Sequence, residues 1–429
     1  MSGAADAGTR TASAALAVTA LAVTALAGSA LAGSALIGPV VAGADPASPA
    51  WVTRAVLAEA APAAGQPPDL PTVTKGCVGQ SPVVASTTPW ALSRMGPQAV
   101  WPLSRGDGVV VAVVDTGVSS AAGGLSGAVR AGTDVVSPGA ANRDCFGRGT
   151  ALAGIIAARP VTGSAVVGIA PGATVLPERI VDSEGKIPPG AIAKGIRAAT
   201  VAGADVIVLG AGTTTPDAEL RSAVRDAAAR DIVLIAAVSD ERPSQTGQSA
   251  PPWYPASDAQ VLAVAGIGMD GVPTETSPPE AGVDLLAPGA GAVSVAPYGP
   301  GHYTVGGPAV AAAYAAGAAA LVRAYHPELG QADVRRRMEL TAEHPLGAQR
   351  APAVGYGTLD LYAAMSALDL DETPMPRRQA APLVLPTEPP TAPAKIIAGV
   401  VGAGTVLTAA IAFLAASVIR WGRLRRWRP

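Results

Sequence analysis

The sequence predicts an α/β fold with a mainly parallel central sheet covered by helices on both faces, followed by one C-terminal transmembrane helix. The first observation is that short, wholly apolar runs rich in β-branched residues alternate with Ala-rich segments of helical period. Fully apolar strands that alternate with helices are typical of parallel sheets buried on both faces. The second observation is that the segment from Ile396 to Ile419 contains no charged residue. A helix of that length can cross the roughly 30 Å hydrocarbon layer of a bilayer.

The alternating pattern defines one predicted domain, residues 77–370. Its predicted strands, in chain order, are Val109–Val114, Asp205–Leu209, Ile232–Ala237 and Val261–Ala265. Its predicted helices are Ala151–Ala158, Gly190–Val201, Leu220–Arg230 and Ala309–Tyr325. We find no internal repeat in the sequence.

The composition limits both the core and the partners. Of the 429 residues, 49% are hydrophobic but only 3% are aromatic, so any core must be built from Ala, Val, Leu and Ile. The 50 glycines and 40 prolines indicate long ordered loops or extended linkers rather than a helical bundle. A formal net charge of -2 gives no electrostatic basis for a nucleic-acid partner.

The N-terminal part of the chain has the features of an export signal. Residues 11–44 are rich in Ala, Leu and Val, follow Arg10 and end in Ala42-Gly43-Ala44, which predicts a signal peptide over residues 1–44. Because the apolar region is long and its basic start is thin, an uncleaved anchor is the alternative. Both interpretations place the following residues outside the cytosol. Residues 45–76 are rich in Pro and Ala and are predicted to form a mobile or surface-wrapping extension.

The C-terminal part of the chain is predicted to hold the protein in the cell membrane by a single span. Residues 371–394 carry seven prolines and are predicted to form an extended linker. The transmembrane helix is placed at residues 395–420, and residues 421–429 form a basic tail. Arginines that follow the apolar segment indicate that this tail is cytoplasmic and that the domain lies on the other side of the membrane. These arginines are Arg420, Arg423, Arg425, Arg426 and Arg428.

The cysteines and histidines indicate a disulfide rather than a metal site. Cys77 and Cys145 are the two cysteines, and an even number in an exported chain favours one disulfide over two free thiols. The three histidines, His302, His326 and His344, have no ligand spacing with either cysteine. No metal and no cofactor are therefore expected.

A series of short motifs follows a fixed order through the predicted domain. Together with Cys77, they are Trp101-Pro102-Leu103, Asp115-Thr116-Gly117, Asp144-Cys145, Gly149-Thr150-Ala151, Val167-Gly168-Ile169-Ala170-Pro171, Tyr254-Pro255-Ala256, Leu286-Ala287-Pro288-Gly289, Gly317–Arg323 and Gly355-Tyr356-Gly357. This order, the proline-rich linker and the terminal anchor resemble the mycosins, the membrane-anchored subtilisin-like serine proteases of type VII secretion systems. The resemblance covers residues 75–429. It implies a subtilisin-like three-layer fold for the domain.

The resemblance assigns the catalytic positions, and two of the three triad residues differ from the family pattern. Asp115 matches the family's aspartate. Arg148 stands at the position of the histidine, where a guanidinium offers only donors and cannot act as a general base. We expect Arg148 to pair with Asp115 and so to satisfy a carboxylate that is otherwise buried alone.

The nucleophile and the oxyanion-binding residue are also replaced in this alignment. Ala309 stands at the position of the serine, counting back from the well-matched segment 316–321, and no serine lies between Ser294 and Ser366. Asp240 stands where the family has the asparagine that holds the negative oxygen. An ionised carboxylate there repels the charge that develops in the reaction.

These replacements predict a mycosin-like pseudoprotease, not an active enzyme. The resemblance implies that it is a structural or accessory component of a type VII secretion system, with membrane complex components as partners. One alternative is a peptide-binding module that uses the retained substrate cleft along Leu209, Gly210 and Ala211 to bind an extended peptide. The other alternative is residual serine endopeptidase activity.

Overall fold

The computed structural model describes residues 65–73, 76–239, 251–274, 282–344, 353–368 and 393–424. The predicted signal peptide, nearly all of the predicted linker and the end of the basic tail lie outside the described residues. Asp240 lies outside them too.

A seven-stranded sheet forms the centre of the domain, and every neighbouring pair of its strands is parallel. Its strand order is β2-β3-β1-β4-β5-β6-β7. The strands are β1 (Val110–Asp115), β2 (Thr133–Asp134), β3 (Thr174–Arg179), β4 (Val206–Leu209), β5 (Val233–Ala237), β6 (Val261–Ile267) and β7 (Leu285–Pro288). The predicted parallel sheet is confirmed.

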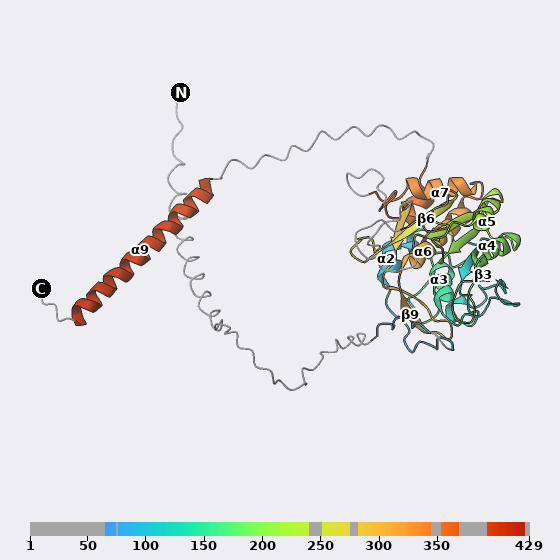
Figure 1. Cartoon of the computed structure of the whole chain (residues 1–429), viewed down its shortest axis with the longest axis horizontal. Coiled ribbons are helices and arrows are strands. Elements are labelled where there is room, and N and C mark those ends of the chain that lie inside the picture. Colours follow the sequence, from blue (N-terminus) through green and yellow to red (C-terminus); the bar gives the residue numbers. More distant parts are fainter. Residues whose placement is uncertain are drawn as a thin grey trace, which may run out of the picture. The chain divides into compact units, whose positions relative to one another are not determined.

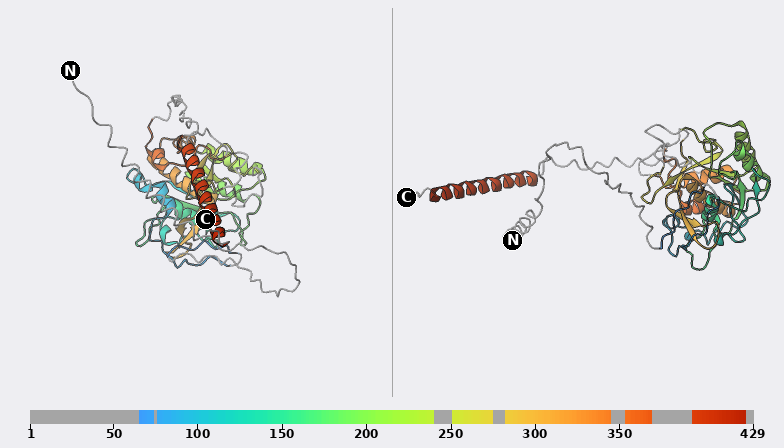
Figure 2. Two further views of the ribbon diagram at one scale, coloured as in Figure 1. Left: turned by 90° about the vertical axis from the view of Figure 1, so that its left-hand side faces the viewer. Right: turned by 60° about the horizontal axis from the view of Figure 1, so that its bottom comes forward.

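Helices cover both faces of this sheet, as the sequence predicts (Figures 1 and 2). The helices of the domain are α2 (Trp90–Met95), α3 (Arg148–Ala157), α4 (Ala191–Val201), α5 (Ala218–Ala229), α6 (Pro308–Tyr325), α7 (Gln331–Leu340) and α8 (Leu361–Ser366). Because side chains alternate along a strand, β1 contributes to two hydrophobic clusters. Val111 and Val113 pack with α3 and α6 on one face. Ala112 and Val114 pack with α4 and α5 on the other.

The smaller elements include two 3-10 helices and an antiparallel hairpin. The 3-10 helices are η1 (Pro97–Ala99) and η2 (Gly123–Leu125), and the hairpin pairs β8 (Ala292–Val295) with β9 (His302–Val305). The N-terminal extension joins β9, since the Leu70 N–H donates to the Thr304 carbonyl over 2.9 Å and the Thr304 N–H donates to the Pro68 carbonyl over 2.8 Å. This part of the extension therefore wraps the domain surface.

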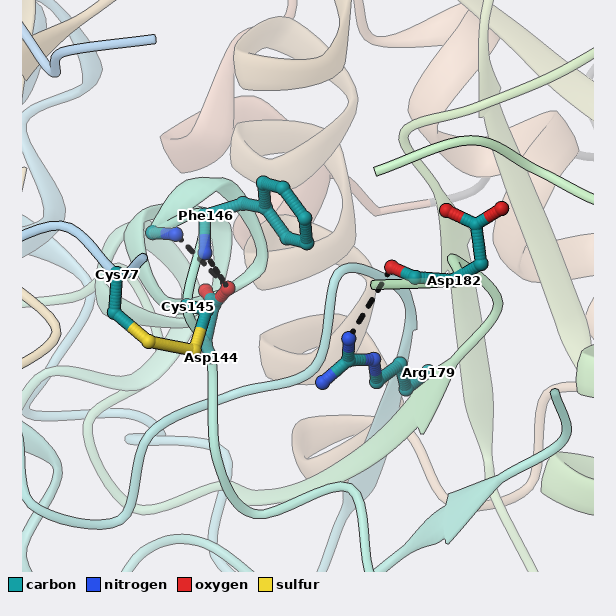
Figure 3. Close-up of a disulfide and its surroundings, with 7 residues drawn as sticks. Cys77, Asp144, Cys145, Phe146, Arg179 and Asp182 are labelled. Atoms are coloured by element: carbon teal, nitrogen blue, oxygen red, sulfur yellow. Dashed lines mark hydrogen bonds between the residues drawn. A yellow bond between two sulfur atoms is a disulfide. The ribbon is translucent and has the colours of Figure 1, made fainter. Parts of the chain in front are cut away.

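The predicted disulfide is present between Cys77 and Cys145 (Figure 3). It joins the extension to the segment immediately before α3. It closes a separation of 68 residues along the chain, so it ties together parts that are far apart in sequence.

The C-terminal helix α9 (Pro393–Leu424) contains a candidate membrane span. The span covers Ala403–Arg423, with a mean hydropathy of 1.8. By length and composition it can cross a bilayer, and it overlaps the predicted segment 395–420.

Candidate functional site

The site begins where β1 ends, at Asp115. In a parallel sheet the carboxyl ends of the strands meet at one edge, which is where such folds place their ligand sites. The Asp115 side chain is fully buried. Its Oδ1 accepts the Thr116 N–H over 2.8 Å and the Arg148 Nε–H over 2.9 Å. Its Oδ2 is buried without a hydrogen-bond partner in the described residues.

Arg148 is placed by the first turn of α3, which is held by the buried carboxyl group of Asp144. Asp144 Oδ1 accepts the backbone N–H of Phe146 (Figure 3) and that of Gly147. Its Oδ2 accepts the backbone N–H and the hydroxyl of Thr150. Burial raises the pKa of Asp144, while these hydrogen bonds oppose the shift. The start of α3 is thus fixed by hydrogen bonds, and the disulfide at Cys145 adds a covalent tie.

The Asp115–Arg148 ion pair is half exposed. Arg148 has 39% of its side chain exposed, whereas Asp115 has none. Water therefore reaches the guanidinium but not the carboxylate. The predicted pairing of the two residues is present, and it neutralises a charge that is costly to bury alone.

Ala309 lies beside this pair at the start of α6. Its side chain is 3% exposed, and it follows Pro308, which suits the first helical position because it has no N–H to satisfy. A Cβ atom on Gly210 would lie 2.5 Å from Asp115 Oδ2 and 3.3 Å from the Ala309 Cβ. The two side chains thus meet at the Gly210 backbone, where only glycine fits.

The structure brings together most of the residues that the sequence singles out. Asp115, Arg148, Gly210 and Ala309 converge at one place. Leu209 is the last residue of β4 and its side chain is buried in the core, so it faces away from the cleft surface. Asp240 lies outside the described residues.

A cavity of about 540 Å³ opens above the ion pair. Arg148, Ala309 and Thr116 line it from the domain, and residues 69–73 of the extension line it as well. The site is therefore an open cleft rather than a filled core. In the described part of the chain, no cluster of His, Cys, Asp and Glu side chains could hold a metal ion.

His302 does not belong to this site. It lies in β9 and is 2% exposed. Its Nδ1 accepts the Ala85 N–H over 3.0 Å, and its Nε2 lies 3.0 Å from the Ser164 hydroxyl. Burial lowers its pKa, so the ring is neutral and both nitrogens are engaged in structure.

The sequence gives no signal for a buried carboxyl group at Glu178 on β3. The side chain is fully buried, and neither oxygen has a hydrogen-bond partner in the described residues. Burial raises the pKa of Glu178 to about 8. Glu178 pairs in register with Val114 on the neighbouring strand.

A parallel sheet with an aspartate at the end of its first strand, beside the starts of two helices, defines a subtilisin-like α/β protein. The sequence model described as the subtilase family matches residues 106–358. Mycosin-4 of Mycobacterium tuberculosis (strain ATCC 25618 / H37Rv) is 32% identical over 331 residues, which cover 67% of this chain and 71% of that protein. Mycosin-3 of the same strain is 30% identical over 384 residues, which cover 74% of this chain and 82% of that protein.

A solved structure shows the same likeness. The structure of the MycP3 protease from the type VII (ESX-3) secretion system superposes with a TM-score of 0.61 at 25% identity, covering 71% of this chain and 97% of that one. The chain therefore belongs to the subtilase family, as one of its mycosins.

Proposed function

We propose that this chain is a non-catalytic, membrane-anchored mycosin that acts as a structural or accessory component of a type VII secretion system. The observation that carries the proposal is the contact of 2.9 Å between Arg148 Nε and Asp115 Oδ1, with the methyl group of Ala309 beside it. In the proposed alignment, this arginine and this methyl group stand where a triad needs an imidazole and a hydroxyl.

The chemistry of the triad explains why these side chains cannot catalyse peptide hydrolysis. In a serine protease the aspartate orients a histidine, which takes a proton from the serine as that serine attacks the peptide carbonyl. A guanidinium stays protonated and accepts no proton, and a methyl group cannot attack a carbonyl. In subtilisin, loss of the serine or of the histidine alone lowers turnover about a millionfold.

The proposed replacement of the oxyanion-binding asparagine by Asp240 acts in the same direction. An ionised carboxylate repels the negative oxygen of the tetrahedral intermediate. Removing one oxyanion donor lowers turnover by about a hundred- to a thousandfold. These losses are not additive, but either triad replacement is enough to abolish useful activity.

The proposed anchoring and partners are supported by α9 and by the relatives. We propose that residues 1–44 are a signal peptide, that the domain of residues 77–370 lies outside the cytoplasm, and that the basic end of the chain is cytoplasmic. The candidate span in α9 and the arginines that follow it support this topology. Because MycP3 is described as a protease from a type VII secretion system, components of such a membrane complex are the proposed partners.

Co-purification tests the accessory role. The full-length chain, tagged and expressed in its own cells, is extracted from membranes in mild detergent and its co-purifying proteins are identified. A matched variant in which α9 is replaced by an unrelated apolar helix serves as the control. We expect secretion-channel components with the native chain, and their absence from that preparation contradicts the accessory role.

A second candidate function is favoured by a backbone edge without hydrogen-bond partners, of which Gly210 and Ala211 are buried and Gly212 is half-buried. In the described residues, the backbone N–H and C=O groups of Gly210, Ala211 and Gly212 have no hydrogen-bond partners, whereas Thr213 pairs with Tyr254. An extended peptide can bind such an edge through its own main chain. We propose peptide binding at this edge as the alternative, and undetectable binding of extended peptides to the full-length chain contradicts it.

A further inference from the structure

We propose that His302 is a pH-sensitive latch, which holds residues 83–85 against β9 while its ring is neutral and releases them when the ring is protonated. The device is a hydrogen bond from a backbone N–H to the imidazole, which only one protonation state of the ring can accept. The inference is independent of the proposed function, because the ring does not line the cavity above the Asp115–Arg148 pair.

The two ring nitrogens of His302 have partners of different kinds. Nδ1 lies 3.0 Å from the backbone nitrogen of Ala85, which is a donor, so Nδ1 must present its lone pair. A neutral imidazole has one N–H, which is therefore on Nε2. There it donates to the hydroxyl oxygen of Ser164 over 3.0 Å. These contacts define a neutral ring with its proton on Nε2.

Three segments that are far apart in the sequence meet at this ring. The backbone N–H of His302 donates to the Val83 carbonyl over 2.8 Å, and the Ala165 N–H donates to the Ala85 carbonyl over 2.8 Å. Residues 83–85 are therefore bonded both to β9 and to the loop that holds Ala165. The imidazole reinforces this junction, because its two nitrogens bind the same two neighbours of β9.

Protonation converts the acceptor at Nδ1 into a second donor. The new N–H points at the N–H of Ala85, so their hydrogen bond is lost. Ala85 is 5% exposed, and a buried donor without an acceptor is destabilising. His302 is itself 2% exposed, and burial lowers its pKa in the closed junction. The open junction therefore binds the proton more tightly, and acid favours the release of residues 83–85.

The segments next to the ring contain no Asp, Glu, Lys or Arg; they are β8, β9, the turn 296–301 between them, and residues 83–85 and 160–166. Two charged groups lie just beyond them and have partners elsewhere. Arg159 donates to the Ser126 carbonyl, and Arg148 on α3 pairs with the buried carboxylate of the candidate site. The other titratable groups of the hairpin are Tyr298 and Tyr303, and the Tyr303 hydroxyl donates to a backbone carbonyl. The imidazole is thus the group through which acid acts at this junction.

Hydrogen exchange of the full-length chain in detergent micelles tests the latch. Exchange at the Ala85 amide is followed by mass spectrometry from about pH 5 to about pH 8, the range in which histidine titrates. Each rate is divided by the intrinsic rate of an unprotected amide at the same pH, which gives a protection factor. The test variant is His302→Asn, whose side-chain oxygen can accept the Ala85 N–H but does not titrate. The matched control is His344→Asn, at an exposed histidine.

We expect the protection of the Ala85 amide to fall by up to about tenfold for each pH unit below about 6.5, in the native chain and in His344→Asn. The sign follows from the lowered pKa, since the closed junction is fully favoured above the ordinary pKa of histidine and is lost as the pH falls below it. In His302→Asn the protection stays constant. A native protection factor that does not change with pH overturns the inference. So does an equal fall in folded His302→Asn, or a fall shared equally by the amides of β6.

A second measurement does not require His302→Asn to fold. The double variant His326→Asn, His344→Asn leaves His302 as the only histidine of the chain. Nitrogen-15 spectra of its labelled ring should show a proton on Nε2 and a lone pair on Nδ1 at about pH 7.5. This signal should disappear over the same pH range in which the Ala85 protection falls. A proton on Nδ1 of the neutral ring contradicts the latch.

Discussion

Replacing Arg148 by Ala is expected to destabilise the domain through the carboxylate that it leaves behind. Asp115 is fully buried, and of the two hydrogen bonds to its Oδ1 only the Thr116 N–H remains in the variant. Removing one partner of a buried pair costs about 3–5 kcal/mol. Because 39% of the Arg148 side chain is exposed, water screens this pair and we expect about 2–4 kcal/mol.

Urea unfolding of the full-length chain in micelles, followed by near-ultraviolet circular dichroism at pH 7, measures this loss. The matched control is Arg197→Ala, which breaks the exposed pair of 2.6 Å with Glu219 and is expected to cost less than about 1 kcal/mol. Adding Asp115→Asn to Arg148→Ala removes the stranded charge and is expected to restore at least half of the loss. The reasoning is refuted if Arg148→Ala costs no more than Arg197→Ala.

Three further predictions concern stability. Glu178 keeps its proton in the folded state up to about pH 8 but releases it near pH 4.5 when unfolded, so its burial lowers stability as pH rises through that window. Glu178→Gln should therefore gain about 3 kcal/mol relative to the native chain between pH 5 and pH 8 in urea titrations, and a pH-independent difference contradicts this. The side chain of Arg337, which is 8% exposed, donates to the carbonyls of Ala364 and Ala367. Arg337→Met leaves these carbonyls without a donor and should lower the free energy of unfolding by about 3 kcal/mol. A loss below about 1 kcal/mol in the same urea titration argues against this. Cys77→Ser removes the disulfide that closes a separation of 68 residues, and it should lower the free energy of unfolding by about 2–4 kcal/mol. Thermal unfolding with and without reductant checks this, and a variant whose stability still depends on reductant contradicts it.

Strands and helices with an uninterrupted apolar pattern are predictable from this sequence. The strands β1, β4, β5 and β6 and the helices α3, α4, α5 and α6 occur where the sequence predicts them, with ends shifted by at most three residues. Helix α5, for example, begins at Ala218 because the Asp217 carboxyl group caps it by accepting the Glu219 N–H over 2.9 Å. Caps of this kind fix where a helix begins or ends, which the apolar periodicity alone does not determine.

Strand β3 shows why other elements escape prediction. Its sequence contains Pro177, Glu178 and Arg179, which local propensity assigns to a loop. The segment is nevertheless a strand, because β1 pairs with it on one side and β2 on the other. Long-range pairing of this kind overrides local preference. The same holds for Thr304, which binds Pro68 across more than two hundred residues of chain.

The candidate site is predictable in its charges but not in its surroundings. Burying the Asp115 carboxylate without a partner is costly, and an arginine beside it can supply the opposite charge. Once the resemblance places Arg148 near Asp115, their contact therefore follows from the residue types. In the described residues, the unpaired backbone of Gly210 and the unpartnered amide of Ala309 depend on where two distant segments end. The positions of these two segments relative to each other cannot be predicted from a sequence pattern.

The central claim, that this mycosin has no serine nucleophile, is tested most directly with a fluorophosphonate probe. The full-length chain in micelles is incubated with the probe beside subtilisin as the positive control, and labelled residues are mapped by mass spectrometry. We predict labelling of subtilisin and none of this chain, because the side chain beside the Asp115–Arg148 pair is the methyl group of Ala309. Stoichiometric labelling of any serine of the native chain contradicts that claim and restores the enzyme interpretation.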